Sequence, residues 1–245
     1  MFRLISSGAI RCVPSQNCKP LFGGRFERVS FHGEKIGMET IIKEITPLFF
    51  SPLIVVEVPN SADLNRKLLD ETASMRRLSP GLQLSNQNGW HSALDFFERA
   101  EPGCVDLARR IIDAIRQATQ AISPGFDFST VGLQCEGWIN VNGKGGFNTP
   151  HDHPGWAWSG TYYVQLPENP PQRSGCIEFL DSRTNVRCIT VDGASCFMSK
   201  YTHRPVSGTM LLFPSYLRHW VYPNEQDEER VSIAFNARFA RLAKK

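Results

Sequence analysis

The feature that most constrains the fold of this chain is a change in the pattern of apolar and turn-forming residues at Thr130. From there to Phe239, short apolar or alternating segments are separated by glycine, proline and asparagine. Segments of about 5–10 residues bounded by such turn residues are typical of β-strands. Many short strands of this spacing predict a jelly roll or cupin-like barrel. The predicted strands are Val131–Val141, Ala157–Gln165, Cys176–Leu180, Cys188–Val191, Thr209–Pro214, His219–Tyr222 and Arg230–Phe239.

Helical periodicity is confined to the preceding part of the chain. One helix is predicted from Asn60, as its N-cap, to Pro80, and a clearer one from Cys104 to Ile122, each with an apolar stripe on one face. A strand within 46–58, a short helix near 92–99 and a loop over 82–90 complete this part. The fold class is therefore mainly β with α, with helices over about 60–125 packed on a barrel over about 130–239.

Composition narrows the class of protein. Of 245 residues, 41% are hydrophobic and 21% charged, which suits a single globular domain, expected over 38–245. Residues 1–37 lack steady periodicity and are expected to form a poorly structured extension. The net charge of +3 gives no sign of nucleic-acid binding, and no apolar run approaches the length of a membrane span. Seven cysteines without a CxxC motif indicate a reduced, cytoplasmic protein.

Histidines provide the first candidate site. His151 and His153 are two residues apart, and side chains at that spacing share one face of an extended strand. His219 begins another predicted strand and could complete a triangle of ligands around a metal ion. Neutral imidazoles suit iron, zinc, copper and nickel. The remaining histidines, His32, His91 and His203, lack such pairing.

Arg230 and Ser232 form the second candidate site. They share one face of a predicted strand whose other residues, including Val231, Ile233 and Phe235, are apolar. A guanidinium and a hydroxyl on one face can together hold a carboxylate, the guanidinium with two parallel donors. The pattern therefore indicates a bound organic acid near the metal.

Together, these motifs resemble those of the 2-oxoglutarate/Fe(II) oxygenase superfamily, and the resemblance covers about residues 45–239. The most similar group is one of bacterial and phage oxygenases distantly similar to prolyl hydroxylases. The resemblance rests on 138–140, 147–148, His151-Asp152-His153-Pro154, 159–164, 175–179, 208–215, His219 and 230–236, with a weaker likeness over 85–92.

The resemblance implies a double-stranded β-helix and an oxidoreductase that uses Fe(II), 2-oxoglutarate and O2. Such a dioxygenase would hydroxylate a substrate and release succinate and CO2. The resemblance makes His151, His153 and His219 the metal and catalytic residues. It makes Arg230 and Ser232 the anchor of the co-substrate, with Tyr163 or Tyr162 and Asn140 beside them.

Two questions stay open at this stage. The superfamily's usual metal motif has a carboxylate where this chain has His153, so either three histidines bind the metal or a bulge turns Asp152 inward. The competing functions are a three-histidine cupin-type dioxygenase or isomerase without 2-oxoglutarate, and a non-catalytic barrel that binds a small acid. The expected partner is a small-molecule or peptide substrate, with no membrane or nucleic acid and with a homodimer as one option.

Overall fold

One long antiparallel strand pair organises the fold. In the computed structural model, which describes residues 43–44, 48–183 and 195–242, β3 (Val131–His151) pairs with β9 (Arg230–Arg241). Their register runs from Val131 opposite Arg241 to Asn142 opposite Arg230. The sheet order is β1-β7-β4-β9-β3-β8-β5-β6, and β2 pairs with β3 off this path. The other strands are β1 (Ile54–Glu57), β2 (Asn86–His91), β4 (Trp158–Gln165), β5 (Ile177–Leu180), β6 (Lys200–His203), β7 (Thr209–Pro214) and β8 (His219–Val221).

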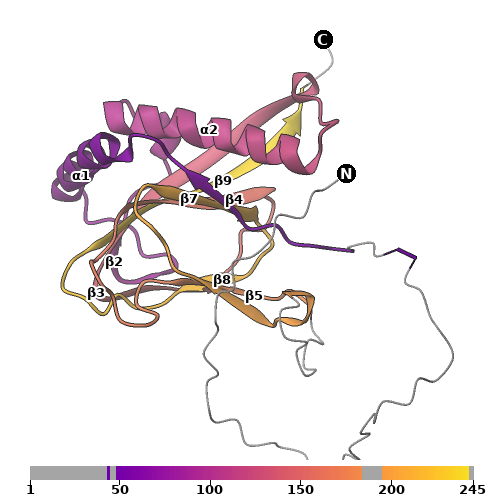
Figure 1. The fold of residues 1–245 in the computed structure, drawn as a ribbon. Helices are drawn as coiled ribbons and strands as arrows, with labels where there is room; N and C mark the ends of the chain where they lie inside the picture. The colour runs from indigo at the N-terminus through magenta and orange to yellow at the C-terminus, as the bar shows by residue number, and fades with distance from the viewer. Residues whose placement is uncertain (1–42, 45–47, 184–194, 243–245) are drawn as a thin grey trace, which may run out of the picture. The chain divides into compact units, whose positions relative to one another are not determined.

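The sheet curls into a half-barrel with two helices on one outer side (Figure 1). β3 makes this possible because its first part pairs with β9, whereas its last residues pair with β8. Between the two parts lies the glycine-rich segment 143–146, in which Gly145 has φ +77, a conformation that glycine adopts without strain. The strand can therefore cross from one layer to the other.

The helices cover the apolar face of β4 and β9. α1 (Ser61–Leu78) and α2 (Pro102–Ile122) bury their stripes against this face, which includes Tyr162, Ile233 and Phe235. A smaller apolar cluster, which includes Tyr163, Phe179 and Phe213, fills part of the space inside the half-barrel. Because strand side chains alternate, the face opposite the helices is left for polar groups.

Glu71 of α1 caps the N-terminus of α2. Its carboxylate accepts the backbone N–H groups of Gly103 at 2.7 Å and Cys104 at 3.0 Å. These donors have no partner within α2 because the first turn of a helix lacks preceding carbonyls. A negative charge at this position is also favoured by the helix dipole.

Several expectations differ from the structure. Residues 86–91 form β2, although they were expected to lie in a loop, because β3 supplies hydrogen-bonding partners to a polar segment. Residues 200–203 form β6, a strand that was not predicted from the sequence. The helix expected near 92–99 is only a 3₁₀ turn, Phe96–Glu98, and Asn60 precedes α1 in a left-handed conformation without a side-chain cap.

Two expectations concern residues outside the described part of the chain. They are the extension over 1–37 and the strand Cys188–Val191, both outside the described ranges. The helices and strands described above all lie within the unit Leu48–Lys245. Among the described residues, no helix combines the length and apolar character needed to cross a membrane.

The Glu71 cap predicts a measurable effect on stability. Glu71→Ala should lower the free energy of unfolding by about 1–2 kcal/mol, since two backbone donors lose their acceptor. Urea denaturation followed by circular dichroism measures this change. Asp70→Ala removes an exposed carboxylate from the same helix and serves as the control. Equal losses in the two variants would contradict the cap.

Candidate metal and co-substrate site

Three histidines from separate backbone segments converge at one end of the half-barrel. His151 ends β3 and pairs directly with His219, the first residue of β8. His153 lies just beyond β3, where its backbone N–H donates to the carbonyl of Ser215 at 3.1 Å. One ring nitrogen from each histidine lies within 4.8 Å of the other two. The three rings therefore surround a point that a single metal ion could occupy.

Backbone carbonyls orient two of these rings. The Nδ1 atom of His151 lies 2.6 Å from the carbonyl oxygen of Thr149, and that of His219 lies 2.8 Å from the carbonyl oxygen of Leu217. A carbonyl only accepts, so Nδ1 of each ring carries the proton. Nε2 of His151 and His219 then presents a lone pair, as a metal ligand requires.

Burial keeps these imidazoles neutral at physiological pH. Desolvation, reinforced by neighbouring histidines, lowers the pKa of His219 to about 3 and that of His153 to about 4. Burial also lowers the pKa of His151 below its ordinary value. Neutral imidazole is the form that binds a metal, so the site is ready for a cation without losing protons.

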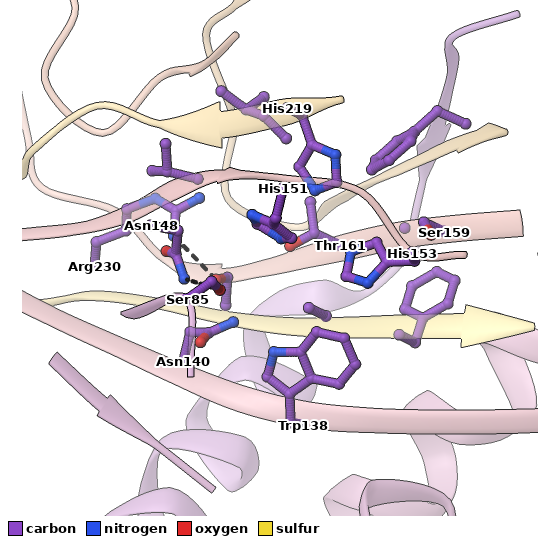
Figure 2. Close-up of a pocket in the computed structure, with 17 residues that line it drawn as sticks. Ser85, Trp138, Asn140, Asn148, His151, His153, Ser159, Thr161, His219 and Arg230 are labelled. Atoms are coloured by element: carbon purple, nitrogen blue, oxygen red, sulfur yellow. Dashed lines mark hydrogen bonds between the residues drawn. The ribbon is translucent and has the colours of Figure 1, made fainter. Parts of the chain in front are cut away.

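Arg230 lies at the other end of the same pocket (Figure 2). Its side chain is buried, Nε donates to the carbonyl of Gly175 at 3.2 Å, and Nη1 donates to Ser232 Oγ at 3.0 Å. Within the described ranges, no carboxylate forms an ion pair with it. An unpaired buried guanidinium is costly, so this end of the pocket suits an anion.

Three buried polar atoms around Arg230, on Tyr163, Asn140 and Asn142, lack hydrogen-bond partners. The hydroxyl of Tyr163 is buried, and the Arg230 guanidinium carbon lies 5.3 Å from the Tyr163 ring centroid. Burial raises the pKa of Tyr163 to about 12, so the hydroxyl keeps its proton and can donate. Oδ1 of Asn140 is also buried without a partner. Unsatisfied buried polar groups are rare in proteins and are frequently found at binding sites.

The floor of the pocket consists of side chains in cross-strand rows. Asn140 of β3 is opposite Ser232 of β9, and both line the pocket. Tyr163 of β4 is opposite Ser232 and continues this row outside the lining. Two residues further along each strand, the next row is Trp138, Ala234 and Thr161. The complete lining is Ser85, Trp138, Asn140, Asn148, His151, His153, Ser159, Gly160, Thr161, Ile177, Phe213, His219, Val221, Arg230, Ser232, Ala234 and Phe235.

Some residues singled out from the sequence lie elsewhere. Asp152 is exposed and does not join the histidine cluster, so the alternative with an inward carboxylate is not supported. Tyr162 faces the helices, where its hydroxyl donates to Asn65 of α1 at 2.6 Å, so only Tyr163 neighbours Arg230. Trp158 and Trp220 do not line the pocket; their indole N–H groups donate to Thr119 and Glu178.

Other residues of the site had no signal in the sequence strong enough to single them out. Gly175 has φ +65, and a Cβ there would lie 3.3 Å from Cδ of Arg230, so glycine allows the arginine to pack against the backbone. Ser85 and Asn148 come from distant segments and contact each other at 3.4 Å. His91 is not part of the lining but stacks on Trp138, which is, with ring centroids 5.5 Å apart.

The residues present fit both a metal ion and an organic diacid. Three neutral imidazoles, two of them oriented by backbone acceptors, form a donor set suited to Fe(II). The unpaired Arg230 with the free Tyr163 hydroxyl suits a carboxylate held deep in the pocket.

Comparison with known proteins agrees with this geometry. Residues 136–236 match the family model 2OG-FeII_Oxy_5, described as "Putative 2OG-Fe(II) oxygenase". These residues include the histidine cluster, Arg230, Ser232 and Tyr163. No curated protein sequence matches the chain.

Solved structures share the fold at low sequence identity. A Pseudomonas putida prolyl-4-hydroxylase superposes with a TM-score of 0.52 at 17% identity and covers 78% of this chain and 93% of its own. A Trichoplax adhaerens prolyl hydroxylase, in complex with a hypoxia inducible factor peptide fragment, superposes with a TM-score of 0.54 at 12% sequence identity. The match covers 76% of this chain and 82% of the hydroxylase. The epimerase SnoN, in complex with Fe3+, alpha ketoglutarate and nogalamycin RO, superposes with a TM-score of 0.54 at 14% sequence identity. The match covers 79% of this chain and 82% of SnoN.

These findings define the fold and the kind of protein that the central segment is similar to. The fold is the jelly roll of the 2-oxoglutarate oxygenases, as the strand spacing predicted. Residues 136–236 match a family model of 2OG-Fe(II) oxygenases, and the histidine cluster within them could hold an iron ion.

The buried histidines predict how the stability of the metal-free protein depends on pH. Below the ordinary histidine pKa of 6.5, His153 and His219 become protonated in the unfolded chain but stay neutral in the folded protein, where their pKa values are lower. The free energy of unfolding should therefore fall as pH drops from about 6.5 to 5, by up to about 1.4 kcal/mol per pH unit for each histidine.

Denaturation at several pH values in the presence of a chelator measures this slope. His219→Gln removes one of the two groups and should make the slope shallower, whereas His203→Gln, outside the cluster, should change it less. A slope that is the same in wild type and His219→Gln would contradict the assignment of a neutral, buried His219.

Proposed function

We propose that the protein hydroxylates a substrate at a C–H bond, with conversion of 2-oxoglutarate and O2 to succinate and CO2. One oxygen atom of O2 would enter the substrate and the other succinate. The observation that carries this proposal is the unpaired, buried Arg230 in the same pocket as three converging histidines. One end of the pocket suits a cation, and the other suits the distal carboxylate of a diacid.

We assign Arg230 and Ser232 to the distal carboxylate of 2-oxoglutarate. Nη1 of Arg230 already contacts Ser232 Oγ, so guanidinium and hydroxyl are aligned on one face of β9. The carbonyl of Gly175 holds Nε and prevents the arginine from swinging out. The Tyr163 hydroxyl would donate to the same carboxylate. Asn140, two residues before Asn142 on β3 and opposite Ser232, would contact the co-substrate from the floor.

We assign His151, His153 and His219 as the metal ligands and therefore as the catalytic residues. These three side chains would hold the iron ion and would leave room beside it for the co-substrate and O2. When bound, the iron supplies the oxidising chemistry, and the chain supplies binding and orientation. Trp138 and Phe213 line the histidine end of the pocket and would limit access of water to it.

The proposed substrate is a small molecule or a peptide. The relatives include one structure in complex with a peptide fragment and one in complex with nogalamycin RO, so the shared fold accommodates both kinds of ligand. A cytoplasmic site of action is supported by free thiols at Cys104, Cys135, Cys176 and Cys196.

The three-histidine donor set also fits an oxygenase that does not consume 2-oxoglutarate. Anaerobic addition of Fe(II) and 2-oxoglutarate, followed by O2, separates the two functions. The proposal expects succinate to form in step with O2 uptake and a substrate from pooled amino acids, peptides or cell extract to gain one oxygen by mass. Oxygen uptake without succinate would favour the alternative.

Arg230→Ala should impair co-substrate binding selectively. The KM for 2-oxoglutarate is expected to rise about 30-fold or more, because truncating one partner of a buried charge pair costs about 2–5 kcal/mol. Metal affinity should change little, since Arg230 does not contact the histidines. Succinate formation measured against 2-oxoglutarate concentration tests this. Arg76→Ala, which removes an arginine paired with Glu229 on the surface, is the control.

His219→Ala should remove tight metal binding. His219 is the most buried member of the cluster and is held by the Leu217 carbonyl, so no other described side chain can replace it. Competition with a chromogenic chelator measures the affinity for Fe(II) under anaerobic conditions. The matched control is His203→Ala, because His203 lies outside the cluster on β6. Retention of wild-type affinity in His219→Ala would refute the metal site.

A further inference from the structure

His153 has a hydrogen-bond partner unlike those of the other two histidines. Nδ1 of His153 lies 3.3 Å from Nδ2 of Asn236, a buried residue of β9. The same Nδ2 donates to a carboxylate oxygen of Glu136 at 2.9 Å, and Oδ1 of Asn236 accepts from the hydroxyl of Ser159 at 2.6 Å. Glu136, Asn236 and Ser159 form one cross-strand row over β3, β9 and β4.

The partners of Asn236 determine which way its amide points. The carboxylate of Glu136 accepts hydrogen bonds and has none to donate, so the amide nitrogen must face it. The opposite orientation would direct the amide oxygen at that carboxylate and turn the amide nitrogen toward the Ser159 hydroxyl. With the orientation determined, the second N–H of the amide is directed at Nδ1 of His153.

This arrangement makes Nδ1 of His153 an acceptor, opposite to the role of Nδ1 in His151 and His219. Those two rings donate Nδ1–H to backbone carbonyls. A neutral imidazole carries one proton, so in the metal-free protein that of His153 is on Nε2.

The amide of Asn236 therefore opposes metal binding by either nitrogen of His153. If Nε2 binds the metal, the proton must move to Nδ1, where it would face the N–H of Asn236. If Nδ1 binds the metal, the ion and the amide compete for one lone pair. Outer hydrogen-bond partners of ligating histidines change metal affinity by about 10–100-fold.

We propose that Asn236, oriented by Glu136 and Ser159, is a positioning residue that sets the tautomer of His153 and makes it the weakest of the three metal ligands. The proposal rests on the proposed metal site. It assigns to His151 and His219 the initial capture of the ion, and to His153 the ligand position that exchanges most readily.

The tautomers can be read directly in the metal-free protein. Histidine-selective ¹⁵N labelling and long-range ¹H–¹⁵N correlation spectra at neutral pH distinguish Nδ1–H from Nε2–H, and single histidine substitutions assign the signals. His151 and His219 are expected to carry the proton on Nδ1, and His153 on Nε2. A proton on Nδ1 of His153 would overturn the proposal whether or not the protein binds a metal.

A paired substitution reverses the chain of hydrogen bonds while it conserves net charge and shape. In Glu136→Gln/Asn236→Asp, the glutamine would donate to the new carboxylate, which would accept Nδ1–H from His153. His153 should change tautomer, and the dissociation constant for Zn²⁺ should decrease about 10-fold or more. Gln134→Glu, on the same strand beside Arg238, is the control and should leave zinc affinity unchanged.

The outcomes separate this proposal from the proposed function. Unchanged or weaker zinc affinity in a folded paired variant, shown by unaltered His151 and His219 signals, would overturn the role of Asn236 while the metal site stands. No zinc binding by the wild-type protein would instead refute the metal site. If the paired variant does not fold, the tautomer of His153 in the wild-type protein tests the proposal alone: a proton on Nε2 supports it and a proton on Nδ1 overturns it.

Discussion

The antiparallel pairing of β3 with β9 is the interaction on which the rest of the structure depends. Its register aligns Asn142 with Arg230 at one end and Glu136 with Asn236 nearer the other, and β4 extends the same rows. A shift by one residue would turn every side chain of a strand to the opposite face. The register therefore brings Arg230, the floor of the pocket and the residues at its histidine end onto one face.

The two faces of this sheet differ in polarity. The face toward α1 and α2 is apolar and supplies most of the buried core. The inner face contains a buried guanidinium without a carboxylate partner, and buried polar atoms of Asn140, Asn142 and Tyr163 without hydrogen bonds. Such groups destabilise a fold unless a ligand satisfies them. The apolar face, with its helices and with Glu71 joining them, provides the stability that lets the inner face remain unsatisfied.

Much of the fold was predictable because most strands bury one face. Alternation predicted β4, β7 and β9 within a few residues, and periodicity predicted both helices. β2 and β6 were missed because their sequences are polar and they become strands only through pairing with β3 and β5. Likewise, the rule that i and i+2 share a face explained the histidine pair only in part, since β3 ends at His151 and a turn orients His153.

The sequence by itself determined the chemical types at the site: three histidines, an arginine and a serine at spacings that suit a metal and a carboxylate. That information is local, because it depends on residue identity and strand alternation. Only the tertiary structure decided that Tyr163 rather than Tyr162 accompanies Arg230, and that Asp152 lies in solvent. It also decided that Asn236 faces His153. These choices depend on sheet register and on contacts between distant strands, which no short stretch of sequence specifies.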